Sequence, residues 1–346
     1  MSDIRYNILD DNYVIIAPER LHRPLTKVTL TNEKRLEDSE NCPFCEGNED
    51  KTTPEIDAIS LEKREPNSPK WRSRVIPNLY RAVSIESENY VKHNGLFVAN
   101  EGFGAHEIVV DTPKHNNLME SWSIEEYCYW IETIQKRIRD LQIDQRLISI
   151  SIFKNQGAKG GATQPHPHTQ IIALPIVPTK LHHQFSRFLE HHQRTGRVLL
   201  EDIIVQEYND RVRIVTENSD FVAFCPYASE YPFEVIIASK EGISRLDRMS
   251  IEEREKLAEI LKFINSSLHS TLGDFDFNLS ISTPPLHHTT QTEPYFNMID
   301  TISRLYIKIM PRIYQHAGFE LSMGMMINPI SPEEASRQLR LYKNGE

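Results

Sequence analysis

The sequence predicts an α+β protein built from two related halves, because one pattern of strand, capped helix and strand occurs twice in the same order. The first copy begins with the apolar segment 106–111 and the second with the apolar segment 233–238. Each is followed by the tetrad Ser-Ile-Glu-Glu. The spacing from Glu107 to Ser123 (123 − 107 = 16) equals that from Glu234 to Ser250 (250 − 234 = 16). A shared tetrad, an equal spacing and matching flanks together indicate a duplication.

Both tetrads are predicted capping boxes, in which the Ser hydroxyl accepts from the N–H three residues on and the Glu reaches back to the Ser N–H. A long amphipathic helix is expected after each, because apolar residues follow at spacings of three and four. These residues are Tyr127, Trp130, Ile131, Ile134, Ile138 and Leu141 in the first copy, and Leu257, Ile260, Leu261, Ile264 and Leu268 in the second. Alternating strands are expected next, at 147–153 and 277–282.

The chain has 346 residues, which suits two domains. We expect an N-terminal half at 1–195 and a C-terminal half at 196–346, joined near the polar stretch 190–197. The segment 46–70 is rich in Asn, Glu, Lys, Pro and Thr and is expected to be a surface excursion.

Composition and charge narrow the function classes. The chain carries 39 Lys and Arg against 49 Asp and Glu, a net charge of −10. This argues against a nucleic-acid or membrane-surface partner but leaves an anionic small substrate open. No signal peptide and no apolar run of about 20 residues is visible. Only four cysteines occur, at 42, 45, 128 and 225, so we expect a reducing, cytoplasmic compartment.

The segment 153–175 carries the strongest functional signal, a Gly-rich loop that ends in His-Pro-His-Thr-Gln between two apolar strands. Alternate residues of a strand share a face, so His166, His168 and Gln170 should point the same way. Glycines let backbone N–H groups approach a phosphate closely. Lys154 and Lys159 would add positive charge.

These residue types suit transfer of a phosphoryl group through a covalent intermediate. A neutral imidazole can attack phosphorus and carry the group, which splits one displacement into two. The Gln170 amide can donate to a phosphoryl oxygen. The simpler alternative is a loop with surface histidines, but glycines upstream and a Gln two places after His168 favour the functional interpretation.

The segment closely resembles the active-site strand of the galactose-1-phosphate uridylyltransferase family, in the histidine-triad superfamily. The family pattern is Asn-x-Gly, a Gly-rich turn and His-Pro-His-x-Gln. The resemblance implies that His168 is the nucleophile, that Gln170 holds the phosphate, and that the phosphate pocket is lined by Asn155, Gly161 and Thr163. It also implies histidine-triad-like halves, each an antiparallel sheet with a long packed helix, and a homodimer.

Two other segments resemble the same family. The stretch 17–24 looks like its Arg-x-x-Arg-Pro element facing the nucleotide, which implies Arg20 and Arg23 as substrate-binding residues; two solvated arginines are the alternative. The stretch 72–80 resembles the segment whose Asn binds the ribose, which implies that role for Asn78, against a plain strand and turn.

Cys42 and Cys45 are spaced so that both thiolates can reach one tetrahedral Zn²⁺. Since a second Cys pair is absent, the other ligands must come from elsewhere. His115 and His166 fit, and the resemblance points to the same four. A redox pair or two unligated core thiols are the alternatives, although a redox motif normally opens a helix and Pro43 precedes an acidic loop. We expect one structural zinc that clamps the catalytic strand.

The second half departs from the family pattern. The family often has a second metal site with a His-x-His, but Tyr306 and Lys308 stand at that place, so no second metal is expected. The adjacent His287 and His288 are interpreted as solvated. The stretch 318–329 looks more like ADP-glucose phosphorylase relatives in the same superfamily, although its Met pair can also be core filler.

The function predicted is exchange of a nucleoside monophosphate between a nucleoside-diphosphate sugar and a sugar 1-phosphate through nucleotidyl-His168, with Lys159 helping to stabilise the charge. The alternatives are adenylyl transfer to inorganic phosphate, as in an ADP-glucose phosphorylase, and a histidine-triad hydrolase. A zinc-stabilised nucleotide-binding protein without turnover is a further alternative, from another class.

Overall fold

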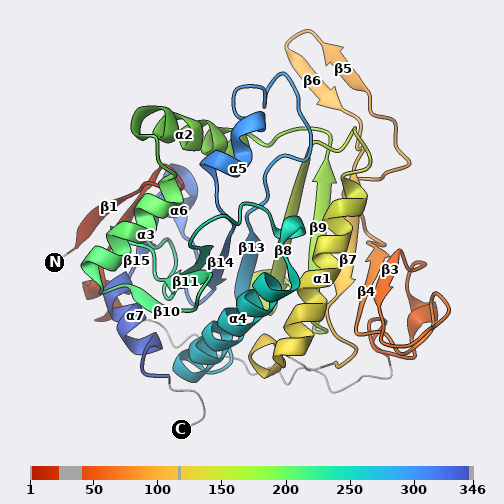
Figure 1. Cartoon of the computed structure of the whole chain (residues 1–346), viewed down its shortest axis with the longest axis horizontal. Helices are drawn as coiled ribbons and strands as arrows, with labels where there is room; N and C mark the ends of the chain where they lie inside the picture. Colours follow the sequence, from red (N-terminus) through yellow and green to blue (C-terminus); the bar gives the residue numbers. More distant parts are fainter. Residues whose placement is uncertain (1, 23–40, 116–117, 343–346) are drawn as a thin grey trace.

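The computed structural model describes residues 2–22, 41–115 and 118–342. Its centre is a ten-stranded antiparallel sheet in the order β10-β11-β12-β14-β13-β8-β9-β7-β4-β3 (Figure 1). The strands are β3 (Asp57–Ile59), β4 (Ser73–Pro77), β7 (Ala105–Val110), β8 (Ser149–Gln156), β9 (His168–Leu174), β10 (Ile214–Glu217), β11 (Phe221–Phe224), β12 (Val235–Ser239), β13 (Phe277–Ile281) and β14 (Tyr306–Pro311).

The two halves share this sheet instead of forming separate ones. Strand β8 of the first half pairs with β13 of the second, and Asn155 lies opposite Asn278. The duplicated strands predicted from the sequence are β7 and β12, followed by β8 and β13, with boundaries shifted by one to three residues. The predicted α+β class is confirmed.

Two long helices, α1 (Ile124–Leu141) and α4 (Ile251–Leu272), pack side by side on one face of the sheet (Figure 1). Both predicted capping boxes are present: Ser123 accepts from the Glu126 N–H, and Ser250 accepts from the Glu253 N–H. The apolar stripes of both helices are buried against the sheet in one core cluster. Burying these stripes is what fixes each helix to its strands.

The opposite face has two covers. Over the second half, α2 (Thr179–Thr195), α3 (Leu199–Asp210) and α5 (Ile299–Ile302) close a second apolar cluster. Over the first half, the Cys42–Cys45 knuckle packs on Ile108 and Val110 of β7. The polar stretch 190–197 is the end of α2 and the turn at Gly196, whose φ is 72°.

The N-terminal hairpin docks on the second half. Strands β1 (Asp3–Asn7), β2 (Asn12–Ile16) and β15 (Met326–Asn328) form a small sheet, in which β2 and β15 are parallel. Asp10, in the hairpin turn, forms a buried ion pair with Lys308 of β14. Lys308 and Tyr306 of β14 are both buried.

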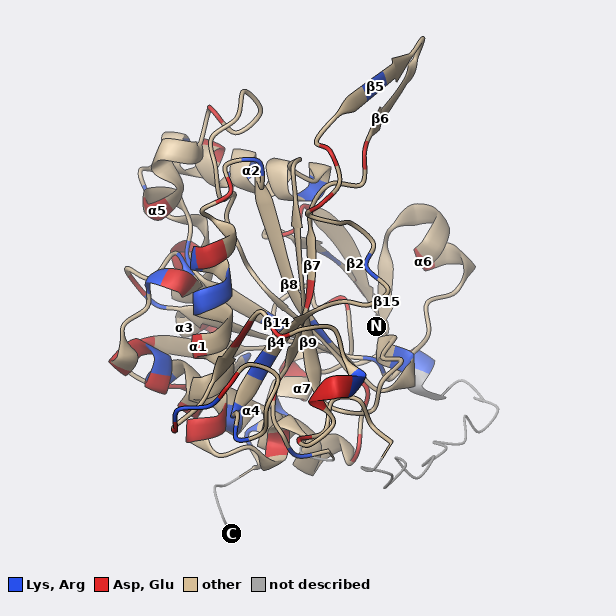
Figure 2. Ribbon diagram, turned by 90° about the vertical axis from the view of Figure 1, so that its right-hand side faces the viewer, with Lys and Arg blue, Asp and Glu red and all other residues tan. Residues whose placement is uncertain are grey.

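The remaining elements lie at the surface. The hairpin of β5 (Val91–Asn94) and β6 (Phe97–Asn100) projects away from the body (Figure 2). Helices α6 (Gly318–Met323) and α7 (Pro332–Leu339) flank β15 near the C-terminal end. Within the described ranges, no helix is both long and apolar enough to cross a membrane.

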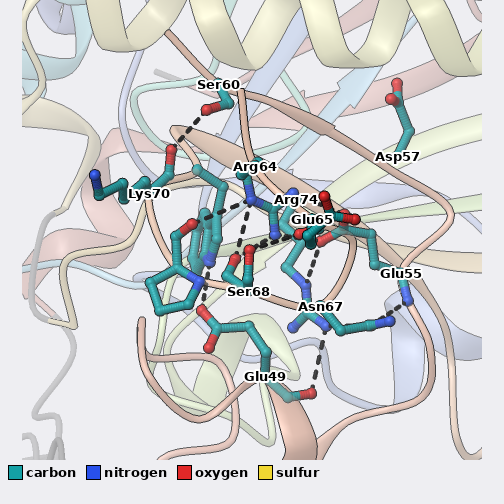
Figure 3. A network of polar contacts seen from close by, with 12 residues as sticks. Glu49, Glu55, Asp57, Ser60, Arg64, Glu65, Asn67, Ser68, Lys70 and Arg74 are labelled. Atoms are coloured by element: carbon teal, nitrogen blue, oxygen red, sulfur yellow. Dashed lines mark hydrogen bonds and ion pairs between the residues drawn. The ribbon is translucent and has the colours of Figure 1, made fainter. Parts of the chain in front are cut away.

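The predicted surface excursion 46–70 is tied down by a polar network (Figure 3). The Glu55 carboxylate is shared by Arg64 at 2.7 Å and by buried Arg74 of β4 at 3.1 Å. The Trp71 indole N–H donates to Glu49 over 2.7 Å. Because Glu49 follows closely on Cys45, the network holds the knuckle against β4 and β7.

Candidate active site and metal centre

His168 is the first residue of β9, and the strand alternation places it on the face away from α1. Its neighbour Thr169 points toward the helix, because the Trp130 indole N–H donates to the Thr169 hydroxyl over 2.9 Å. His168 and Gln170 therefore share the opposite face, where the knuckle lies. Pairing with β7 sets Gln170 opposite Ile108.

The His168 imidazole is held in one tautomer. Its Nδ1 lies 2.9 Å from the His166 carbonyl oxygen, which can only accept, so Nδ1 carries the proton. Burial lowers the pKa of His168 below its ordinary value, so the ring is neutral near pH 7. The Nε2 lone pair is therefore available for attack.

The Gly-rich loop between β8 and β9 is tighter than the sequence suggested. Gly157 and Gly161 adopt φ values of 74° and 85°, which only glycine adopts readily. The backbone N–H groups of residues 160, 161 and 162 donate to loop carbonyls, and that of Lys159 donates to Asp276. These N–H groups are engaged within the fold, so side-chain amides are the better phosphate donors.

Lys154 supplies its positive charge from the core face of the sheet, beside the backbone of His168. Its ammonium is fully buried, 2.6 Å from the Asp111 carboxylate and 3.3 Å from the His168 carbonyl oxygen. Strand alternation puts Lys154 on the core face with Ile150 and Ile152. Its charge lies beside the backbone of His168, and half-buried Lys159 remains the loop's cation.

The two predicted amides, Gln170 and Asn155, each have a partner that the sequence did not reveal. Gln170 Oε1 lies 3.0 Å from Nε2 of His106, which also contacts Asn78. Asn155 Oδ1 accepts from Asn278 of the second half over 2.8 Å. His106 and Ile108 are two residues apart in β7, so the strand alternation alone could have placed both on the site face. The contact of Asn278 with Asn155 could be predicted only from the order of strands in the sheet.

The other predicted substrate-binding residues make no contact with His168 or Gln170 among the contacts of the described residues. Thr163 lies exposed in the loop beyond Gly161. Arg20 is exposed on the 3-10 turn Pro18–His22 that follows β2. Arg23 lies outside the described residues. The roles of all three stay predictions.

Cys42, Cys45, His115 and His166 form the one group of potential metal ligands found in the described ranges, with ligand atoms all within 4.8 Å of one another. The Nδ1 of His166 lies 3.7 Å from Cys42 Sγ and 3.6 Å from Cys45 Sγ, and His115 Nδ1 lies 3.2 Å from Cys45 Sγ.

The surroundings of this group fit a metal. His166 donates its other ring nitrogen to the Thr112 carbonyl over 2.7 Å, which presents Nδ1 to the cysteines, the orientation that metal-binding histidines use. Phe44, between the cysteines, packs edge-on against the His168 ring at 5.6 Å between centroids. Phe44 thus lies between the four potential ligands and His168.

Comparisons with known proteins agree with this geometry. The model of the galactose-1-phosphate uridyl transferase N-terminal domain matches residues 1–178, and that of the C-terminal domain matches residues 181–342. The chain is 28% identical over 340 residues to an ADP-glucose phosphorylase of Arabidopsis thaliana, spanning 98% of this chain and 92% of the relative. It is 26% identical to a galactose-1-phosphate uridylyltransferase of Thermotoga maritima, spanning 98% of each.

A crystal structure of an Arabidopsis thaliana ADP-glucose phosphorylase with bound ADP-glucose superposes with a TM-score of 0.82 at 27% identity, covering 99% of this chain and 100% of that one. Fold, site and relatives together define a nucleotidyltransferase. The chain belongs to the galactose-1-phosphate uridyl transferase family, because the two domain models together cover nearly its whole length.

Proposed function

We propose that this enzyme moves a nucleoside monophosphate from a nucleoside-diphosphate sugar to a second phosphate compound through a bond to Nε2 of His168. The observation that carries the proposal is the 2.9 Å contact between His168 Nδ1 and the His166 carbonyl, which leaves Nε2 unprotonated. A neutral, fixed imidazole is the nucleophile that a two-step displacement needs.

In the first step, Nε2 attacks the α-phosphorus, a P–N bond forms, and the P–O bond to the sugar 1-phosphate breaks. In the second step, an acceptor phosphate oxygen attacks the same phosphorus and releases His168. The imidazole gains positive charge while it is bonded to phosphorus, and the His166 carbonyl stabilises that charge through Nδ1–H. Gln170 and Asn155 donate to the phosphoryl oxygens.

We propose Zn²⁺ as the ion held by Cys42, Cys45, His115 and His166, since two thiolates and two imidazoles are a typical structural zinc set. Bound there, the ion would crosslink the knuckle to β9 and would take no part in the displacement. The proposal is supported by the burial of Cys42, Cys45 and His166 and by the hydrogen bond from His166 to the Thr112 carbonyl.

The donor and the acceptor define two candidate reactions. Exchange between a UDP-sugar and a hexose 1-phosphate is the first. Adenylyl transfer from an ADP-sugar to inorganic phosphate is the second, and it is favoured by the ADP-glucose phosphorylase whose structure superposes at 0.82. An assay of each donor, UDP-glucose or ADP-glucose, with each of three acceptors, glucose 1-phosphate, galactose 1-phosphate and phosphate, decides between them.

His168→Gly is the variant that tests the nucleophile. We expect it to lose transfer by more than about 10³-fold while its melting temperature and zinc content stay at parental values. Retained transfer in this folded variant would refute the proposal. Release of free nucleoside monophosphate without any acceptor would favour a hydrolase instead.

We also propose that the enzyme is a cytoplasmic homodimer. The projecting β5–β6 hairpin carries exposed apolar side chains at its tip, Leu96 at 97% and Phe97 at 77% exposure, and such a surface suits a second copy of the chain. Sedimentation equilibrium tests the dimer, and a monomer at micromolar concentration would contradict it.

A further inference from the structure

We propose that His106 and Asn278, one from each half, are positioning residues that fix the carboxamides of Gln170 and Asn155. They bind both amide oxygens on the side away from the phosphoryl group on His168, so that both NH₂ groups face that phosphoryl group. The inference rests on the proposed function, in which these two amides bind phosphate. It adds two residues that do not touch the substrate themselves.

The tautomer of His106 follows from its contacts. The backbone N–H of Ala82 donates to His106 Nδ1 over 3.0 Å, so Nδ1 is an acceptor and carries no proton. In a neutral imidazole the proton then sits on Nε2. This Nε2–H must donate, and it lies near two amides.

Only one of those amides offers an acceptor. The Asn78 oxygen already accepts from the Tyr80 N–H over 2.8 Å, so Asn78 turns its NH₂ toward Nε2. An amide nitrogen cannot accept, so this 3.0 Å approach is not a hydrogen bond when Nε2 carries the proton. Gln170 presents Oε1 at 3.0 Å from Nε2. The Nε2–H of His106 therefore donates to Gln170. Since oxygen and nitrogen are fixed on one planar carbon, this bond also fixes where the Gln170 NH₂ points.

Asn278 does the same for Asn155 from the other side of the site. Its Nδ2 donates to Asn155 Oδ1 over 2.8 Å and to the Gly160 carbonyl over 2.7 Å, which uses both of its protons. The Asn155 NH₂ is thereby turned toward the Gly-rich loop, and a Cβ on Gly161 would lie 4.0 Å from it.

Residues next to Asn278 hold the loop itself. The Asp276 carboxylate accepts from the Lys159 N–H over 2.8 Å, and a Cβ at Gly157 would come within 1.8 Å of Asp276. A Cβ at Gly160 would lie 2.7 Å from the Phe277 carbonyl oxygen. The second half therefore sets both the loop and the amide beside it before any substrate binds.

This arrangement matters because a carboxamide has two ends of opposite character. With the nitrogen inward it donates to a phosphoryl oxygen; with the oxygen inward it repels one. Donors that are oriented in advance need no reorganisation during reaction, and losing one typically lowers the rate by about 10²–10³-fold. His106 and Asn278 would act by keeping the productive end inward.

The test compares variants that remove the hydrogen bond to Gln170 or Asn155 with a variant that keeps a donor in its place. His106→Leu removes the donor, whereas His106→Gln places an amide nitrogen near the former Nε2. Asn278→Asp is nearly isosteric but offers oxygen to Asn155 Oδ1, so it should turn the Asn155 amide around. His288→Leu and Asn297→Asp make the same chemical changes at exposed positions and serve as matched controls.

Single-turnover labelling of the protein with the nucleotide sugar gives two readouts. The amplitude reports the fraction of folded, competent sites, and the rate constant reports the chemistry. We expect His106→Leu and Asn278→Asp to keep the parental amplitude while the rate constant falls about 10²-fold. His106→Gln should recover at least about tenfold of that loss, and both controls should match the parent.

Rate constants of His106→Leu and Asn278→Asp within about threefold of the parent would overturn the inference, as would a fall in amplitude alone, which indicates a structural role. If either variant does not fold, a crystal structure of the parent with bound nucleoside monophosphate decides, since an amide oxygen facing the phosphate contradicts the inference. Label on His168→Gly would instead overturn the proposed function. The two failures are therefore distinguishable.

Discussion

The site is built from side chains whose partners leave them one orientation each. His168 donates Nδ1–H to a backbone carbonyl, and His166 donates Nε2–H to another. Each ring is thereby left with one nitrogen that does not bind the backbone: Nε2 in His168 and Nδ1 in His166. Under the proposed function, the first would attack phosphorus and the second would bind the metal.

The buried ion pair of Lys154 and Asp111 supports this strand at the level of single residues. Both side chains are fully buried, so removing one partner leaves an uncompensated charge. We expect Lys154→Met to lower the free energy of unfolding by about 3–5 kcal/mol. Urea unfolding of the single variant and of Lys154→Met with Asp111→Leu measures this.

The double variant is the informative control. Because it removes both charges, it should be clearly more stable than Lys154→Met. A single variant as stable as the parent would show that the pair is not desolvated in solution.

The positions of several candidate site residues could be predicted from the sequence, because the pattern that indicates them lies within one strand. The alternation along 166–170 depends on one strand, so the predicted facing of His168 and Gln170, with Thr169 turned away, agrees with the Trp130–Thr169 bond. The same rule applied to Ile150 and Ile152 would have put Lys154 in the core. The contacts of His106 and Asn278 depend on which strands are neighbours in the sheet. The sequence of a single strand does not determine its neighbours.

At the scale of elements, the duplicated capping boxes anchor the two helices that cover the sheet. In each, the Ser hydroxyl accepts from the N–H of the Glu three residues on, and the carboxylate of that Glu accepts from the Ser N–H. We expect Ser123→Ala and Ser250→Ala each to cost about 1 kcal/mol of unfolding free energy. Thermal unfolding measures it, with exposed Ser121→Ala as the control.

Because the two caps are equivalent in geometry, their costs should agree within a factor of about two. A cost at one helix and none at the other would contradict the view that the halves use one device twice. These boxes were fully readable from the sequence, since a capping box involves only four consecutive residues.

Under the proposed function, the Cys42–Cys45 segment with its zinc would connect stability to catalysis. Removing the ion with a chelator should lower the melting temperature and the transfer rate together, because Phe44 packs on both the His166 and the His168 rings. Metal content, melting temperature and turnover measured on one sample test this. Full activity in the metal-free protein would contradict a structural zinc.

At the scale of the whole molecule, the second half extends the sheet of the first half and holds its Gly-rich loop. One sheet crosses both, and Asp276 and Asn278 hold the Gly-rich loop. Lys308 of β14 pairs with Asp10, and Glu234 and Tyr306 lie nearby. This ion pair joins the N-terminal hairpin to the sheet.

This pair predicts an acid-dependent stability. Burial favours a raised pKa for Asp10, but attraction by Lys308 outweighs it and holds the pKa below its ordinary value. A carboxyl with a depressed pKa contributes stability above the unfolded pKa of about 4, and this is lost as pH falls through the folded pKa. We expect Asp10→Asn to cost about 3–5 kcal/mol at pH 7.

The cost of Asp10→Asn should shrink as the pH falls below about 4, because the parent then loses the same charge. Urea unfolding of parent and variant at pH 7 and at pH 3 measures the difference. An equal cost at both values would show that the Asp10 charge does not hold the hairpin.

The central claim is that the nucleotide passes through a covalent bond to one imidazole. Mixing the protein briefly with UDP-glucose or ADP-glucose, followed by quenching at alkaline pH and mass spectrometry of its peptides, tests it most directly. We expect a nucleoside monophosphate on the peptide that contains His168, formed fast enough for turnover and removed by the acceptor. Turnover at full rate without any such adduct, or an adduct on another residue, would contradict it.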